Sequence, residues 1–312
     1  MIRVINPKDT LNTNTSVALG TFDGLHLGHM TIINKLCSEG GFKKCVFTFS
    51  NSPAQVVSNN RVKYIMSAKE KEELLEKSGV DYLVNRDFDE EFMSLTAEEF
   101  FKKYILEILH AKEIYVGYNY TFGKNKTGNT EVLKSLCSEH SIKLNVIPPV
   151  FSGNEPISST RIRNEIAMGN LKEATKLLGR PVCVCGVVTE GNRIGRTIGF
   201  PTANIPVDTN RALPPDGVYA ASTQINGAVY PCIANLGMRP TVSDKGERLF
   251  EAHIIEYEAD LYGKYMIFEF AEKIRDIKKF DSVNQLKEQL EKDAKCVKGI
   301  MRQKMFDNRK NL

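Results

Sequence analysis

A glycine-rich stretch near the N-terminus, GTFDGLHLGH at residues 20–29, combines residue types that handle phosphate groups. Glycines allow tight turns and close approach of the backbone to a phosphate, and a helix that begins there presents unpaired N–H groups. His26 and His29 stand three residues apart, so on a helix they share a face and can stabilise charge developing on a phosphate chain. The alternative is a glycine turn with two incidental histidines. We expect this histidine turn (residues 20–29) to bind ATP through Gly20, Phe22 and Gly24.

A second stretch, GNRIGRTIGFPTANI at residues 191–205, suits phosphate and metal binding. Its glycines predict a flexible loop, and its arginines can face phosphates. Thr202 and Asn204 follow a proline that fixes the backbone, and their oxygens are of the kind that magnesium prefers. A barrel loop made of turn-forming residues is the alternative. We expect nucleotide contacts at Gly195 and Arg196, and metal ligands at Thr202 and Asn204.

Short apolar runs and helical patterns alternate through the first half of the chain. Strands are predicted at 16–20, 44–49, 81–84, 113–117 and 144–148. Between them, a helix is predicted at 67–79 from a Ser67 cap, and another at 96–109 from a Thr96–Glu99 capping box. This alternation is typical of a parallel sheet with helices on its faces, so the histidine turn would join a strand to a helix.

The pattern changes near residue 180. Residues 158–181 read as helical, and β-rich runs broken by turn residues follow, with hairpin turns predicted at 225–227 and 259–264. The spacing leaves no room for crossover helices, so an antiparallel barrel or sandwich is expected, followed by a long helix at 282–306. Cys183 and Cys185 alternate in one run and are predicted to share the core face of a strand.

Length and charge narrow the classes of function. The 312 residues suggest about two domains, and the formal charge of +4 is too mild to imply a nucleic-acid partner. The sequence has no apolar run long enough for a bilayer and no signal-peptide core, so we expect a soluble cytoplasmic protein without a membrane partner. Seven scattered cysteines without a CxxC pair argue against a disulfide scaffold or a zinc site. A basic tail from Lys295 to Lys310 keeps nucleic-acid binding as an alternative, although a solvated helix face explains it more simply.

The histidine turn resembles the HxGH nucleotidyltransferase superfamily, whose members move a nucleotidyl group from a nucleoside triphosphate to an acceptor and release pyrophosphate. The resemblance implies a second motif at a helix start, and ISSTRIR at 157–163 matches it. Ser159 and Thr160 would supply hydroxyl and backbone donors, and Arg163 a guanidinium fork for the leaving pyrophosphate. Taken alone, this segment would be an ordinary capped helix with surface arginines.

Most of the chain resembles bacterial bifunctional riboflavin kinase/FAD synthetases. Residues 191–205 are similar to their flavokinase module, and so are PPDGVYA, ANLGMRPT, EAHIIEYEADLYGK and IRDIKKFDSVNQLKEQLEKD. The HxGH and SSTRIR segments stand in the family's order. The resemblance implies an α/β, Rossmann-like nucleotidyltransferase domain at 1–181. It also implies an all-β domain at 182–312, an antiparallel flavokinase barrel with a C-terminal helix.

The implied activities are ATP-dependent phosphorylation of riboflavin to FMN, and adenylylation of FMN to FAD with release of pyrophosphate. For the kinase, the resemblance implies Glu251 as the base for the riboflavin hydroxyl, with Thr202 and Asn204 holding Mg²⁺ or a similar ion. A surface position on a strand edge is the alternative for Glu251. For adenylylation, the implied catalytic residues are His26, His29 and Arg163, and the implied flavin-binding residue is Asn119.

Two positions depart from the family's pattern. Ser52 stands where the family often has the histidine of a proline-histidine-proline turn, and Tyr118 replaces a residue that is often acidic. Both lie in the first module, so two interpretations are kept. One is an enzyme with two activities. The other is a riboflavin kinase whose N-terminal domain is a structural or regulatory flavin binder.

Overall fold

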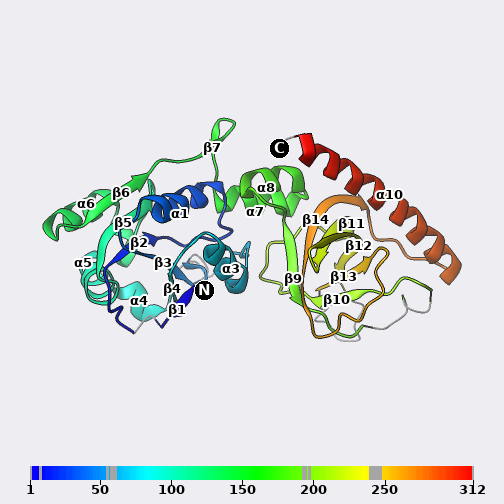
Figure 1. Ribbon diagram of the computed structural model, residues 1–312, viewed down its shortest axis with the longest axis horizontal. Coiled ribbons are helices and arrows are strands. Elements are labelled where there is room, and N and C mark those ends of the chain that lie inside the picture. Colours follow the sequence, from blue (N-terminus) through cyan, green and yellow to red (C-terminus); the bar gives the residue numbers. More distant parts are fainter. Residues whose placement is uncertain are drawn as a thin grey trace. The chain divides into compact units, whose positions relative to one another are not determined.

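The computed structural model of the chain describes residues 2–6, 9–53, 56, 62–191, 195, 198–238 and 248–310, with side chains described as far as residue 304. The chain divides into two compact units, residues 1–161 and 162–312. Parallel strands and helices build the first unit, and antiparallel strands with a long helix build most of the second (Figure 1).

The first unit is built on a six-stranded sheet in the order β1-β4-β3-β2-β5-β6, in which every neighbouring pair runs parallel. All five residues of the central strand β2 are buried, as expected for a sheet covered on both faces. The strands are β1 (Arg3–Ile5), β2 (Thr15–Leu19), β3 (Lys43–Phe49), β4 (Tyr82–Arg86), β5 (Ala111–Gly117) and β6 (Lys143–Ile147).

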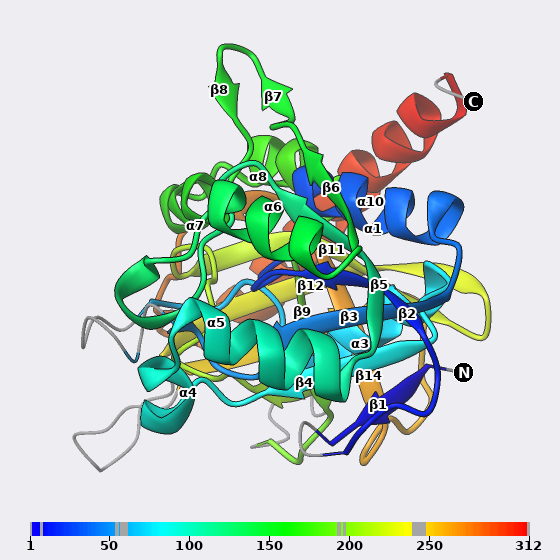
Figure 2. The same ribbon diagram turned by 90° about the vertical axis from the view of Figure 1, so that its left-hand side faces the viewer.

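Helices cover both faces of this sheet. On one face, α1 (Leu27–Glu39) and α3 (Ala68–Lys77) pack through a core that includes Leu36 and Leu75. The other face has a larger, aromatic-rich core, and in Figure 2 the helix formed by α5 and η1 lies along the sheet. The helices that contribute to this second core are α4 (Glu90–Ser94), α5 (Ala97–Phe100), the π-helical η1 (Phe101–Ile108) and α6 (Thr130–Glu139).

The strand order reverses direction at β2. From β2 the chain moves outward through β3 to β4, and it then returns to place β5 and β6 on the other side of β2. Open parallel sheets bind ligands at such a reversal, beyond the carboxyl ends of the strands. The histidine turn directly follows β2 and Asn119 directly follows β5, so the fold brings these two predicted segments to the same edge of the sheet.

The second unit contains a six-stranded antiparallel sheet in the order β10-β13-β12-β11-β14-β9. The Thr189 N–H donates to the Asn204 carbonyl at 2.8 Å, which joins the end of one edge strand to the other and nearly closes a barrel. The packed rings of Phe250 and Phe268 are fully buried. The strands are β9 (Cys183–Val187), β10 (Ala203–Pro206), β11 (Gly217–Ile225), β12 (Ala228–Met238), β13 (Arg248–Ile254) and β14 (Tyr265–Arg275).

Helix α7 (Ser159–Met168) crosses the boundary between the units, and α8 (Leu171–Leu178) follows it. The predicted terminal helix is confirmed as α10 (Val283–Lys310), which packs Val297 and Met301 into a core with strands β11 and β12. Its basic side chains as far as Lys304 are exposed or partly exposed, and Lys298 pairs with Glu256 at 2.6 Å.

The predicted helix caps are confirmed. Ser67 Oγ accepts from the Glu70 N–H at 3.3 Å, while the Ser67 N–H donates to Glu70 Oε2 at 2.8 Å. Thr96 and Glu99 exchange the same two bonds at the start of α5. These reciprocal bonds satisfy N–H groups that the first helical turn leaves unpaired, so the local sequence is sufficient to start each helix.

One predicted hairpin turn is confirmed and the other is wrong. Strands β11 and β12 pair directly across Asn226 and Gly227, which both have positive φ, as a two-residue hairpin requires. The turn at 259–264 connects β13 to β14, but β12 and β11 lie between those strands in the barrel. Its Gly263 N–H instead donates to the Val188 carbonyl at 3.0 Å, so it carries the chain across one end of the barrel.

The placement of Cys183 and Cys185 in the core is also wrong. The two side chains share a face of β9, but both are half-buried, while Val184 between them is buried. The segment 158–181 is interrupted as well, because Gly169 adopts a φ of 80° between α7 and α8. Strict alternation identifies a face of a strand, and only packing decides which face is inside.

The elements α4, α6 and β10 were not predicted from the sequence. Four shorter elements were not predicted either. They are β1, the hairpin strands β7 (Phe151–Ser152) and β8 (Glu155–Pro156), and the 3₁₀ turn η2 (Lys124–Lys126). Each has two or three residues, which is too few to show a periodic pattern. Every helix that the structure describes is too short or too polar to cross a membrane.

Candidate active sites

The histidine turn makes a sharp bend between β2 and α1. Phe22, Gly24 and Leu25 all have positive φ, at 46°, 81° and 37°. Left-handed backbone at two residues other than glycine is strained, and such strain is concentrated at functional sites. A side chain at Gly20 would start 3.0 Å from the ring of Phe22, so glycine there leaves room for this ring, which is 1% exposed. Phe22 is therefore a buried residue that packs beneath the turn.

The two histidines lie against each other. His26 is the N-cap of α1, and its Nδ1 accepts from the His29 N–H at 3.2 Å. The rings stack with centroids 3.6 Å apart, and the ring of Phe22 meets the His29 ring edge-on at 5.4 Å. Because Nδ1 of His26 is an acceptor, its Nε2 carries the proton in the neutral ring and remains a donor. The structure thus joins the predicted pair into one imidazole stack at the start of a helix.

The segment with Ser159 is fastened to the same turn. Ser159 Oγ donates to the Asp23 carbonyl at 2.9 Å, and Asp23 Oδ1 accepts from the Ile65 N–H at 2.9 Å. Thr160 is exposed beside Ser159, and Arg163 stands one helical turn further along α7, partly exposed. Ser159 therefore meets the histidine turn across 136 residues of sequence, which its position alone could not establish.

Asn119 is exposed just beyond the end of β5, and Tyr118 beside it is 46% exposed. The Tyr120 N–H closes a tight turn onto the Gly117 carbonyl at 3.1 Å, while the ring of Tyr120 stacks on Phe122. The turn leaves residues 118 and 119 at the edge where ligands of this sheet type bind, and directs the next aromatic residues into the core.

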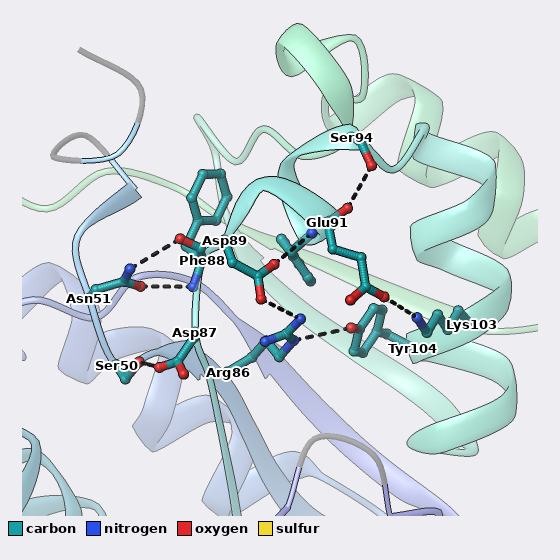
Figure 3. Close-up of polar contacts among 11 residues, drawn as sticks. Ser50, Asn51, Arg86, Asp87, Phe88, Asp89, Glu91, Ser94, Lys103 and Tyr104 are labelled. Atoms are coloured by element: carbon teal, nitrogen blue, oxygen red, sulfur yellow. Dashed lines mark hydrogen bonds and ion pairs between the residues drawn. The ribbon is translucent and has the colours of Figure 1, made fainter. Parts of the chain in front are cut away.

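The segment after β3, where Ser52 stands, is held by contacts that the sequence did not reveal. The side chain of Asn51 makes two bonds to the backbone of Phe88, donating to its carbonyl at 3.0 Å and accepting from its N–H at 2.8 Å (Figure 3). Ser50 bonds to Asp87 beside it. These hydrogen bonds hold the carboxyl ends of β3 and β4 together. Ser52, which is partly exposed, follows Asn51 directly.

In the second unit, three polar side chains form a row across neighbouring strands. Glu251 of β13 lies directly opposite Asn204 of β10 and Asn235 of β12. Asn235 Nδ2 donates to Glu251 Oε2 at 3.2 Å. Because β13 is an inner strand of the barrel, Glu251 is not at a strand edge, and it is partly exposed. We call Asn204, Glu251 and Asn235 the polar row.

The carboxamide of Asn204 has the features of a ligand-holding group. Asn204 is 3% exposed, its Nδ2 donates to the Thr202 carbonyl at 3.3 Å, and its Oδ1 accepts from none of the residues that the structure describes. A buried carbonyl oxygen without a partner is costly unless a ligand uses it. Hard oxygens from Asn204 and the exposed Thr202 are suited to magnesium, so the residues present fit the predicted ion.

His253 and Asn235 are candidate site residues that sequence reasoning missed. His253 Nδ1 lies 2.9 Å from the Pro201 carbonyl, which only accepts, so Nδ1 carries the proton. Burial lowers the pKa of His253, which keeps the ring neutral near pH 7. His253, on β13, thus holds the backbone of the 191–205 stretch at Pro201. The available signal was its spacing of two from Glu251, which places both on one face of a strand.

The glycines of this stretch have steric roles. A Cβ at Gly195 would lie 2.2 Å from the carbonyl oxygen of Phe200, and the Phe200 N–H donates to the Gly195 carbonyl at 2.7 Å. A Cβ at Gly191 would lie 2.5 Å from Asn204 Nδ2. The predicted arginine at position 196 and its neighbour at 193 lie outside the described residues.

If the second unit has the riboflavin kinase activity that the resemblance implies, replacing Gly191 with alanine is expected to lower that activity by roughly 10²-fold, the scale for displacing a positioned group by about 1 Å. The added methyl must push the Asn204 carboxamide from its place, because that side chain is buried. Gly299→Ala in α10 is the matched control, since nothing lies within 4 Å of its Cβ position. Steady-state assays of FMN formation, with circular dichroism to verify folding, measure the effect. Unchanged kinase activity in Gly191→Ala would contradict the role given to Asn204.

Comparisons with known proteins agree with the two-unit architecture. A family model described as FAD synthetase matches residues 8–161, and one described as riboflavin kinase matches residues 178–301. A bifunctional riboflavin kinase/FMN adenylyltransferase of Listeria monocytogenes is 34% identical over 301 residues, covering 95% of each chain. One from Escherichia coli strain K12 is 33% identical over 282 residues, covering 89% of this chain and 90% of the relative.

A solved structure, described as a macrolide-efflux protein from Streptococcus pneumoniae, shares 38% identity and has a TM-score of 0.83, covering 95% of this chain and 98% of that one. Over 95% of its length, the chain therefore has a fold that has been observed experimentally. The parallel-sheet unit and the barrel, each with its own matching family model, define a two-module transferase. The chain belongs to the bifunctional riboflavin kinase/FMN adenylyltransferase family.

Proposed function

We propose that this chain phosphorylates riboflavin to FMN and then adenylylates FMN to FAD, using ATP as co-substrate in both steps. The observation that carries the proposal is that each matched module holds its own cluster of predicted residues. The stacked histidines lie in the first module and the polar row lies in the second. A kinase with a purely structural N-terminal domain would not need the strained turn that presents His26 and His29 at a helix start.

In the kinase step, Glu251 takes the proton from the 5′-hydroxyl of riboflavin. The freed oxygen forms a bond to the γ-phosphorus of ATP while the bond from that phosphorus to the β–γ bridging oxygen breaks, leaving FMN and ADP. The hydrogen bond from Asn235 fixes one carboxylate oxygen of Glu251, which directs the other toward the hydroxyl. The remaining rate enhancement comes from positioning, because phosphoryl transfer leaves little covalent chemistry to the protein.

Thr202 and Asn204 would hold Mg²⁺ in this step. When bound, the ion neutralises phosphate charge and orients the triphosphate. Asn204 stands directly opposite Glu251. A nucleotide whose phosphates bind at Asn204 would therefore lie next to the proposed base. Gly195 and Arg196 are proposed to contact the same nucleotide.

In the adenylylation step, the phosphate of FMN attacks the α-phosphorus of ATP and the α–β bridging bond breaks to release pyrophosphate. The attacking oxygen is already anionic, so a general base is not required. His26 Nε2 and His29 would donate to the phosphate chain as charge shifts onto the leaving group. Ser159, Thr160 and Arg163 are proposed to bind the pyrophosphate portion, Gly20 and Gly24 the nucleotide, and Asn119 the flavin side.

The proposed domains are 1–181 for adenylylation and 182–312 for phosphorylation, so that α7 and α8 belong to the first. In support of this boundary, the riboflavin kinase family model begins only at residue 178. A cytoplasmic location is also proposed. In support of it, all seven cysteines are free thiols, including the buried Cys45, Cys137 and Cys232, as is usual in a reducing compartment.

Chromatography of the products from riboflavin, ATP and Mg²⁺ tests both activities. FMN is expected to appear first and FAD after it, and omission of Mg²⁺ is expected to suppress FMN formation. FMN without FAD above the no-enzyme control would leave only the kinase interpretation. FAD formed from added FMN, without any FMN from riboflavin, would refute the kinase assignment.

A further inference from the structure

A lysine is buried beside the histidine turn, on the side of the sheet covered by α3. Lys71 is 7% exposed, although an ammonium group is costly to remove from water. Its Nζ lies 3.3 Å from the Thr21 carbonyl, 3.3 Å from Thr48 Oγ1 and 3.2 Å from the Phe49 carbonyl. An ammonium group has three N–H donors, and these three oxygens account for all of them.

The three acceptors belong to the two segments that frame the first site. Thr21 is part of the histidine turn, whereas Thr48 and Phe49 end β3 immediately before the segment with Ser52. Thr48 Oγ1 also donates to the Thr21 carbonyl, at 2.8 Å. One ammonium group on a third element, α3, therefore ties the turn after β2 to the carboxyl end of β3.

All three acceptors are uncharged oxygens, so this contact set does not neutralise the ammonium. Burial lowers the pKa of Lys71 to about 8, and the carboxylate of Asp23 in the histidine turn acts in the opposite direction. A methionine could fill a similar volume without this desolvation penalty. A buried, charged group that is kept beside a phosphate site suggests that the charge has a use there.

We propose that Lys71 is a positioning residue for FMN adenylylation, whose buried ammonium fixes the histidine turn against β3 and supplies positive charge near the phosphates of ATP. The proposal rests on the proposed adenylylation at this turn. Lys71 does not contact substrate, because its donors are used by the protein. Its effect is transmitted through Thr21, which lies between β2 and the strained residues of the turn.

Three variants test the proposal in the full-length protein. Lys71→Met removes the charge and keeps a similar shape, Lys71→Arg keeps the charge, and Lys77→Met removes an exposed lysine from the same helix. For Lys71→Met, kcat/KM for FMN adenylylation is expected to fall about tenfold to a hundredfold, the range for misplaced catalytic groups. The rate of riboflavin phosphorylation, measured on the same variant, is expected to stay within about twofold of the rate of the unmodified protein. This second activity is the internal control for correct folding and for the ATP supply. Lys71→Arg is expected to recover part of the loss, and Lys77→Met to behave as the unmodified protein.

A pH series separates charge from packing. As pH rises through about 8, Lys71 loses its proton, so adenylylation relative to phosphorylation is expected to decline in the unmodified protein but not in Lys71→Arg. Asp23 is the acidic group that acts on Lys71, and the same pH series on Lys71→Arg shows any change that arises from other groups. Full adenylylation activity in Lys71→Met overturns the inference while leaving the proposed function intact. An absence of FAD with the unmodified protein refutes the proposed function itself, and the inference with it.

Discussion

Glu251→Gln is expected to lower riboflavin phosphorylation by about 10² to 10⁴-fold, the contribution typical of a positioned general base. Glutamine keeps the size of the side chain and a group that can accept from Asn235, but it cannot take a proton from the riboflavin hydroxyl. FMN adenylylation is expected to remain near normal, since the first module contains its own predicted residues. Initial rates of FMN and FAD formation, measured separately from riboflavin and from FMN, give both values.

Glu258→Gln is a suitable control for this prediction, because Glu258 is an exposed glutamate shortly after the same strand. If the acid at position 251 only maintained the barrel, both glutamine variants would fold and neither would lose kinase activity. An equal loss of both activities in Glu251→Gln would contradict two separate sites. A kinase rate unchanged by the substitution would remove Glu251 from the role of base.

His29→Ala is expected to produce the reverse pattern. Removing one donor that stabilises developing charge costs about 10² to 10³-fold in rate, so adenylylation should fall by that amount while phosphorylation is kept. His29 is preferable to His26 for this test, because His26 also caps α1 and its loss would disturb the helix start. The assay is FAD and pyrophosphate formation from FMN and ATP, with riboflavin phosphorylation measured in parallel.

His140→Ala is the matched control, since His140 is an exposed histidine that ends α6 in the same unit. It removes an imidazole without touching the stacked pair. Loss of phosphorylation alone in His29→Ala would refute the placement of adenylylation at the histidine turn. An unchanged FAD rate would indicate that the ring of His29 serves packing against Phe22 and His26, and not catalysis.

Local signals were predicted well because their physics is local. The capping boxes at Ser67 and Thr96 and the hairpin at Asn226–Gly227 involve bonds or φ angles within a few residues, so sequence order is enough to recognise them. The hairpin predicted at 259–264 was wrong because two strands that are consecutive in sequence need not be neighbours in a barrel. The prediction that Cys183 and Cys185 face the core failed for a related reason, because alternation does not tell which face of a strand will be covered.

By itself, the sequence determined the two modules, the chemistry of their motifs and the strand-to-helix context of the histidine turn. Only the tertiary structure decided which groups meet: Ser159 with Asp23, Asn235 with Glu251, and Lys71 with Thr21 and Phe49. These contacts join residues that are between 16 and 136 positions apart. Their formation depends on strand order and register, and these are fixed by burying apolar faces across the whole unit and not by the residues that meet.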